Sequence, residues 1–170
     1  LVVGDPREEA TQVGPQVTKL QAEKTRQYIE LAKRDGGRVI AEAEISKSAK
    51  IAAGYYVRPT AFLDLPKTSV AVSEEIFGPV LSILPYDSID HAIEMANDTP
   101  YGLAAYIAGS VEEAKPVARR LRAGTVNLNY PAWDTFAPFG GYKQSGNGRE
   151  YADWGIHDFC EVKGIVGWAE

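Results

Sequence analysis

The chain has 170 residues, of which 45% are hydrophobic and 24% are charged, and it carries a net charge of −5 at pH 7. This composition is typical of a globular protein, and the acidic balance with scattered Lys and Arg residues argues against a nucleic-acid surface. A single cysteine, Cys160, excludes an internal disulfide and a zinc site built from several thiolates.

The opening residues and the hydropathy bear on where the chain works. The sequence begins with Leu1 and its only methionine is Met95, so we expect either a removed leader or a piece of a longer protein. No apolar run approaches the roughly 18 residues that a membrane span needs, and the opening is too short and polar for a signal peptide. We therefore expect a cytoplasmic protein that contacts neither membrane nor nucleic acid.

The first predicted element is a helix that follows a polar opening loop. Thr18 and Gln21 have the spacing of a capping box, and a pair of glycines ends the helical pattern. Leu20, Tyr28 and Leu31 share one face of this helix. That face is predicted to pack against the rest of the fold.

Strands and helices alternate through the middle of the chain. Runs rich in β-branched and aromatic residues predict strands, and apolar residues spaced at helical intervals predict helices. The predicted strands cover residues 38–43, 55–63, 80–86, 103–108 and 125–129, and the later predicted helices cover 89–96 and 110–121. Such alternation indicates parallel pairing through right-handed crossovers. We therefore predict an α/β fold with a parallel sheet and helices on both of its faces.

The closing part of the sequence has a different character. Residues 130–149 are rich in glycine and aromatic side chains, which is too specific a composition for a mere connector. A short helix is predicted around 150–155, and an apolar strand follows at 159–168 with no obvious partner nearby in sequence. We predict that this strand is an extended arm that pairs with another copy of the chain.

Metal and thiol chemistry find little support in the sequence. His91 and His157 have no Cys, Asp or Glu residues at ligand spacing, so we predict no metal site. Cys160 lies in the terminal apolar stretch, where a thiol usually behaves as a small buried hydrophobe. We therefore assign no catalytic nucleophile to the histidines or to Cys160.

A first candidate site lies at residues 73–80, where two carboxylates precede an aromatic residue, a glycine and a proline. A carboxylate such as Glu75 can accept two hydrogen bonds from a vicinal diol, and the ring of Phe77 can lie against a flat heterocycle. The pattern alone favours a plainer alternative, a solvated glutamate pair beside a core phenylalanine, because Phe is mostly buried and Glu mostly exposed.

A second candidate site lies at residues 137–150. Gly140 and Gly141 follow Phe139, and two adjacent glycines allow another backbone or a ligand to approach closely. The alternative is a packed loop in which Phe139 serves as the plug.

Four motifs in order along the chain resemble those of the NAD(P)-dependent aldehyde dehydrogenase superfamily. They lie at residues 74–80, 97–104, 123–126 together with Asn129, and 138–146. The resemblance spans essentially the whole chain but only about the last third of the family's length. It implies that residues 1–158 are part of a catalytic domain without the segments that carry the nucleophilic Cys and the general-base Glu. It also implies that residues 159–170 are an oligomerisation arm, with 159–168 extending a neighbouring subunit's sheet.

The resemblance also assigns roles to residues of the two candidate sites. Glu75 would bind the hydroxyls of the nicotinamide ribose, and Phe77 would pack beside the nicotinamide ring of NAD or NADP. Phe139 would line the aldehyde tunnel, with Asn129 at the end of its strand and Trp133 in the same wall. No catalytic residue in the strict sense falls within the chain.

The family's reaction is covalent: a thiolate attacks the aldehyde, hydride passes to the nicotinamide, and the thioester is hydrolysed or captured by coenzyme A. The chain alone is predicted to be inactive because it has no nucleophile. Two alternatives stay open, a non-catalytic assembly module that acts through the terminal strand, and a relative that reduces acyl phosphates or makes acyl-CoA.

Overall fold

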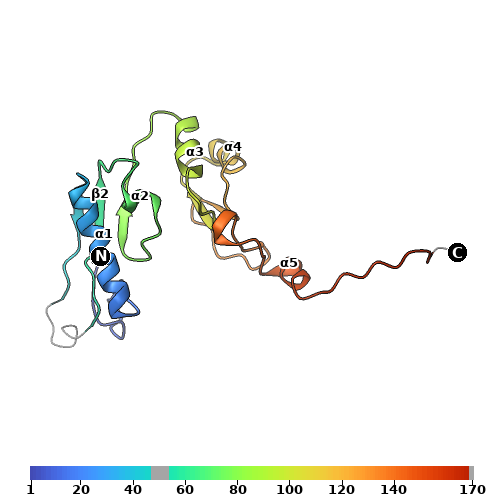
Figure 1. The fold of residues 1–170 in the computed structure, drawn as a ribbon, viewed down its shortest axis with the longest axis horizontal. Coiled ribbons are helices and arrows are strands. Elements are labelled where there is room, and N and C mark those ends of the chain that lie inside the picture. The colour runs from blue at the N-terminus through green and yellow to red at the C-terminus, as the bar shows by residue number, and fades with distance from the viewer. Residues whose placement is uncertain (47–53, 169–170) are drawn as a thin grey trace. The chain divides into compact units, whose positions relative to one another are not determined.

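The computed structural model describes residues 1–46 and 54–168, and the chain forms two compact units, Leu1–Pro85 and Tyr86–Glu170 (Figure 1). The end of the predicted arm, residues 169–170, lies outside the described residues. Each unit combines helices with a small sheet, so the fold is mixed α/β, as predicted.

The first unit contains the long helix α1 (Lys19–Arg34). Its start is the predicted one, because Thr18 Oγ1 accepts a hydrogen bond from the backbone N–H of Gln21 at 3.1 Å. The predicted apolar face is only partly right: Tyr28 is buried, but Leu20 is 75% exposed. The buried residues of the helix are Ala22, Thr25, Tyr28, Ile29 and Ala32. The three small residues among them, Ala22, Thr25 and Ala32, let the helix lie close to the sheet.

The sheet of the first unit has three strands, β1 (Arg38–Glu42), β2 (Thr60–Leu63) and β3 (Val80–Ser82), in the order β1-β2-β3. β2 and β3 are parallel, and the short helix α2 (Val70–Ser73) lies in the connection between them. β1 and β2 are antiparallel, so the prediction of a wholly parallel sheet is wrong at this edge. Antiparallel strands need no crossover connection, and the strand pattern alone does not fix their direction.

The core of the first unit lies between α1 and this sheet, centred on the fully buried Phe62. Ile76, which follows α2, is also buried in this core. The loop between α2 and β3 is therefore anchored at its middle residue. This anchoring matters because the loop contains the first candidate site.

The second unit contains a two-stranded parallel sheet, β4 (Ala104–Ile107) with β5 (Thr125–Leu128). Helix α4 (Val111–Ala118) connects the strands, so the predicted strand, helix and strand are confirmed here. Helix α3 (Ile89–Asn97) precedes them. Because β3 and β4 belong to different sheets, the single sheet that was predicted is replaced by two small ones.

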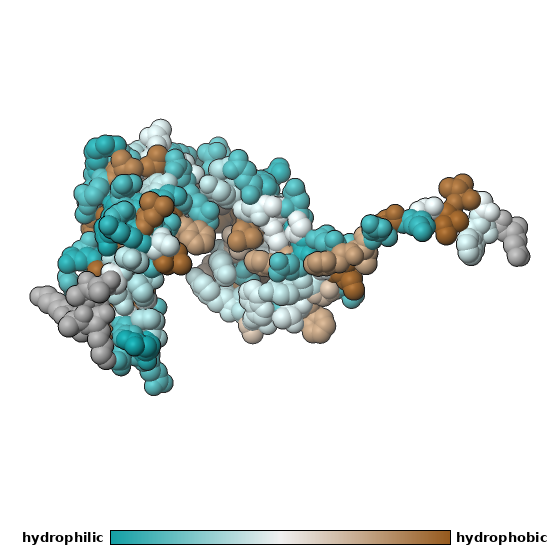
Figure 2. Space-filling view, turned by 60° about the horizontal axis from the view of Figure 1, so that its bottom comes forward, coloured by the Kyte–Doolittle hydropathy of each residue, from teal (hydrophilic) through white to brown (hydrophobic). Residues whose placement is uncertain are grey.

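After the 3-10 turn η1 (Lys143–Ser145) and helix α5 (Ala152–His157), the chain continues as a tail. Residues 159–168 form no strand within this single chain, and Val162 and Val166 are each 99% exposed. Apolar and polar residues are interspersed along the tail in Figure 2. Cys160 is exposed, so the expectation of a buried thiol is wrong, because the tail has no neighbour to cover it.

Two negative findings apply to the described part of the chain. None of its helices is long and apolar enough to cross a membrane. No group of three or more His, Cys, Asp or Glu side chains is placed to hold a metal ion among residues 1–46 and 54–168.

Candidate functional site

The first candidate site is the loop from Glu74 to Pro79, between the end of α2 and the start of β3. Side chains alternate along it: Ile76 is buried, whereas Glu75 is exposed and Phe77 is 74% exposed. This exposure contradicts the alternative of a core phenylalanine. An exposed aromatic beside an exposed carboxylate, both on an anchored loop, is an arrangement that can bind a ligand.

The two glutamates of this loop have different surroundings. The hydroxyl of the buried Tyr28 on α1 donates a hydrogen bond to Glu74 Oε2 at 2.5 Å. Glu75 makes no side-chain hydrogen bond or ion pair within the described residues. Glu74 thus fastens the loop to the helix, while both carboxylate oxygens of Glu75 remain available as acceptors.

Phe77 has an unusual backbone. Its φ of 54° lies in the left-handed region, which costs a residue with a side chain roughly 1–2 kcal/mol. A conformation of this kind persists only where the surrounding structure enforces it, and such positions cluster at functional sites. The enforcing contact is visible: Gln21 Nε2 on α1 donates to the carbonyl oxygens of Ile76 at 3.0 Å and Phe77 at 2.9 Å.

Gly78 is required by the close approach of the loop to α1. A Cβ atom at this position would lie 2.5 Å from Thr25 Oγ1 and 2.6 Å from Thr25 Cγ2. Thr25 is fully buried and has little room to move. The contacts of α1 with the loop were not predicted, because the residues they join, Gln21 with Phe77 and Thr25 with Gly78, are more than fifty positions apart in sequence.

The second candidate site is an aromatic cluster in the second unit. The ring centroids of Trp133 and Phe139 are 6.2 Å apart, so the structure brings these two predicted residues together. Tyr151 joins them, 5.8 Å from Trp133 in an edge-to-face arrangement and 6.0 Å from Phe139. Tyr151 was not predicted as a site residue. Its place follows from an antiparallel bridge between Phe139 and Glu150, which sets the next residue beside the other two rings.

The backbone of the second site is fixed by close approaches at glycines. A Cβ atom on Gly124 would overlap the carbonyl oxygen of Gly140, and one on Gly140 would overlap that of Gly148. The prediction that the adjacent glycines admit another backbone is therefore confirmed. Arg149 completes this arrangement, since its Nη1 donates to the carbonyl oxygens of Gly141 at 2.9 Å and Gly148 at 2.8 Å.

Asn129 lies at the carboxyl end of β5, as predicted. Its Oδ1 accepts a hydrogen bond from the backbone N–H of Gly109 at 2.9 Å, so the side chain holds the turn after β4. Its φ of 56° is one that asparagine tolerates well. The described contacts connect Asn129 to this turn and not to the rings of Trp133 and Phe139.

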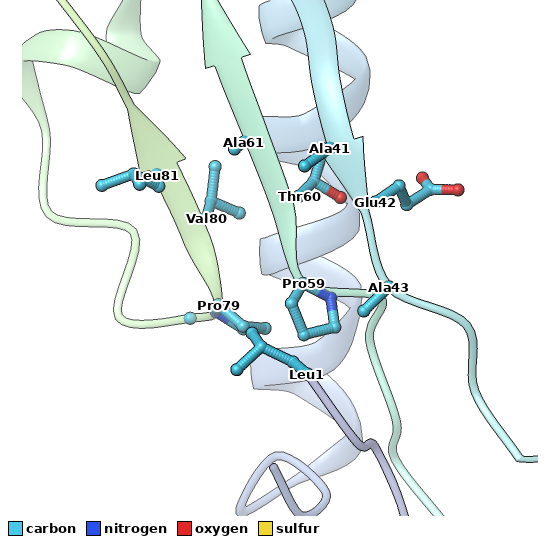
Figure 3. A pocket seen from close by; sticks show the side chains of 11 residues that line it. Leu1, Ala41, Glu42, Ala43, Pro59, Thr60, Ala61, Pro79, Val80 and Leu81 are labelled. Carbon is cyan, nitrogen blue, oxygen red and sulfur yellow. The ribbon is translucent and has the colours of Figure 1, made fainter. Parts of the chain in front are cut away.

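A hollow of about 390 Å³ lies on the face of the three-stranded sheet opposite α1 (Figure 3). Its lining is mostly apolar and includes Ala41, Pro59, Val80 and Leu81. Neither Glu75 nor Phe77 lines it. The hollow is an uncovered part of the sheet, and it borders the first candidate site at Gly78 and Pro79.

Comparison with known proteins gives a consistent result. The sequence profile of the Aldehyde dehydrogenase family matches residues 1–165. A Staphylococcus aureus protein described as a candidate aldehyde dehydrogenase is 44% identical over 167 residues, which are 98% of this chain and 35% of that protein. The chain thus spans about a third of the length of the curated relatives it matches.

Solved structures agree with this match. A cysteine-to-alanine variant of aldehyde dehydrogenase C from Pseudomonas syringae, solved with NAD+ and octanal, has a TM-score of 0.91 and 44% identity over 99% of this chain and 35% of its own. A Mycobacterium tuberculosis aldehyde dehydrogenase, solved with NAD+, has a TM-score of 0.87 and 35% identity over 100% of this chain and 36% of its own. By sequence and by fold, the chain belongs to the aldehyde dehydrogenase family.

Proposed function

We propose that the chain is the C-terminal portion of an NAD(P)-dependent aldehyde dehydrogenase that oxidises an aldehyde to a carboxylic acid through a cysteine thioester. Residues 1–158 then form part of the catalytic domain, and residues 159–170 form the arm. The observation that supports this most directly is the exposed pair Glu75 and Phe77 on an anchored loop. The chain that carries this pair is 44% identical to a dehydrogenase solved with NAD+ and octanal.

The residues of this loop fit a nicotinamide cofactor. The Glu75 carboxylate has no side-chain partner in the described chain and can accept two hydrogen bonds from the vicinal hydroxyls of a ribose. The exposed Phe77 ring can lie beside the flat nicotinamide. When bound, the cofactor supplies hydride acceptance. The contribution of this chain is to hold the ribose and ring in place, since small misplacements cost large factors in rate.

The aromatic cluster is proposed as part of the substrate pocket. Trp133 is 70% exposed, and its contacts with Phe139 form a wall suited to the apolar body of an aldehyde. Asn129 is proposed to stand at the edge of this pocket, where its hydrogen bond to Gly109 fixes the end of β5.

The tail is proposed to join copies of the chain into a homo-oligomer through residues 159–168. Phe159 is 90% exposed and Val166 is 99% exposed. Several exposed apolar side chains in one segment are typical of a surface that a partner covers. Addition of this segment to the edge of another subunit's sheet would cover the side chains and pair the backbone groups.

The proposed function is tested with a hybrid in which this chain replaces the matched segment of the Pseudomonas syringae dehydrogenase, with that enzyme's substituted cysteine restored. We expect the hybrid to oxidise octanal with NAD+, while the isolated 170-residue chain does not, because the family's nucleophilic cysteine lies outside it and Cys160 lies in the tail. Replacement Glu75→Gln is expected to raise the KM for NAD+ about tenfold, since a neutral amide accepts hydrogen bonds less strongly than a carboxylate. Glu94→Gln, at an exposed glutamate on α3, is the matched control and should change nothing.

A folded hybrid that binds no NAD+ would contradict the proposal. In that case the alternative of a non-catalytic assembly module gains support if the isolated chain forms a discrete oligomer by analytical ultracentrifugation. The alternative of a relative that makes acyl-CoA or reduces acyl phosphates is tested by supplying coenzyme A or phosphate to the proposed full-length dehydrogenase, because the segment with the nucleophile decides between these reactions.

A further inference from the structure

We propose that Gln21 is a positioning residue for the candidate cofactor site: its side-chain amide holds the backbone of Phe77 in the conformation that presents Phe77 and Glu75 together. This inference rests on the proposed function, because it concerns how the nicotinamide loop is set. Gln21 acts through the loop backbone and is given no contact with the cofactor.

The geometry of the amide carries the proposal. One nitrogen, Gln21 Nε2, donates to the carbonyl oxygens of both Ile76 and Phe77, at 3.0 and 2.9 Å. These two carbonyls belong to the peptide planes on either side of the Phe77 Cα atom. A donor that binds both of them holds both planes, and hence fixes the φ and ψ of Phe77.

Phe77 needs such support because its φ of 54° is unfavourable for a residue with a side chain. Without the two hydrogen bonds, we expect Phe77 to relax toward negative φ. That rotation would redirect its ring and change the position of Glu75 two residues earlier. The arrangement of the two exposed side chains thus depends on a residue of α1 that touches neither of them.

Other side chains of α1 contact the loop on both sides of Phe77. Thr25 and Tyr28 follow Gln21 at intervals of four and three residues, so the three side chains share one face of the helix. Tyr28 binds Glu74 at the start of the loop, and Thr25 contacts Gly78 at its end. Of these three side chains, only that of Gln21 donates to the backbone of Phe77, and this distinguishes it from the other two.

The test uses the active hybrid and compares Gln21→Met with Gln27→Met. Methionine keeps the length of glutamine and removes its donors, and Gln27 is an exposed glutamine on the same helix. We expect Gln21→Met to raise the KM for NAD+ about tenfold, the factor that corresponds to about 1.4 kcal/mol, and to leave the KM for octanal unchanged. Gln27→Met should change neither value. An unchanged KM for NAD+ in Gln21→Met would overturn the proposal.

A double-mutant cycle tests whether Gln21 works through Phe77. In a Phe77→Gly background, we expect Gln21→Met to change the KM for NAD+ by less than twofold, because glycine adopts the left-handed φ without the support of Gln21. Equal effects in both backgrounds would overturn the proposal. Crystal structures of both single variants give a further readout, in which Phe77 should leave the left-handed region in Gln21→Met and keep it in Gln27→Met.

The two proposals fail in different ways. If the parent hybrid binds no NAD+, the proposed function is wrong and the present inference falls with it. If the parent binds NAD+ and Gln21→Met behaves as the parent does, only the inference is wrong. A variant that fails to fold is replaced by Gln21→Glu, whose carboxylate repels the two carbonyl oxygens and should raise the KM for NAD+ at least as much as Gln21→Met. An unchanged KM in this variant also overturns the inference.

Discussion

The two candidate sites are fixed in different ways. The loop of Glu75 and Phe77 is held by side chains of α1. These side chains belong to Gln21, Thr25 and Tyr28. At the aromatic cluster, two stretches of backbone pack directly against each other at glycines such as Gly124. The difference teaches that the first site can be adjusted by single side-chain changes, whereas the backbone of the second tolerates almost none.

The largest expected effect is that of Gly124→Ala. The new Cβ would overlap the carbonyl oxygen of Gly140, and neither backbone can give way easily. We expect a loss of about 3 kcal/mol or more in the free energy of unfolding, at the upper end of overpacking effects. Urea denaturation measures the loss, and hydrogen exchange should place it in the second unit. A loss below about 1 kcal/mol would show that this backbone contact is less rigid than described.

Gly78→Ala is expected to cost about 2 kcal/mol, because the new methyl group meets Thr25, a side chain. The comparison becomes sharper with Thr25→Ala, which removes the two atoms in the way. The double variant should recover part of the loss, and no single change should rescue Gly124→Ala in the same manner. Additive losses in the double variant would argue against the contact.

Tyr28→Phe is expected to cost about 1 kcal/mol, the usual net value of one hydrogen bond. The exposed Glu74 carboxylate can return to water, so no buried group is left unpaired. The measurement is the urea midpoint of the chain, with hydrogen exchange of residues 74–79 as the local readout. Loss of protection confined to the second unit would contradict the assignment of Tyr28 to this loop.

Tyr151→Leu is expected to have the smallest effect, about 0.5 kcal/mol from the lost ring contacts with Trp133 and Phe139. Its main consequence should be a change of two- to threefold in preference between aromatic and aliphatic aldehydes, measured as kcat/KM in the hybrid. An unchanged preference would place Tyr151 outside the substrate pocket.

Elements whose signals are local were predicted well. Thr18 begins α1 with the hydrogen bond that its spacing from Gln21 indicates, and β4 pairs with β5 through a helical crossover as expected. Pairing between strands is a long-range property, so the antiparallel β1 and β2 and the division into two small sheets were not predicted.

The candidate sites show the same limit. The pattern around Glu75 and Phe77 permitted a ligand site but favoured a buried ring, and only the structure shows the ring to be exposed. The spacing of Thr18 and Gln21 indicated a capping box, and the backbone half of it is present. The Gln21 side chain instead reaches carbonyls 55 and 56 residues further along the chain. No short-range rule can reveal such a contact.

The exposed Cys160 has a practical consequence. It is the only cysteine among the 170 residues, and it lies at the start of the tail. A maleimide-linked spin label or fluorophore would therefore attach at one defined position, with no engineered mutation. Energy transfer between labelled copies would report directly on whether copies of the chain associate.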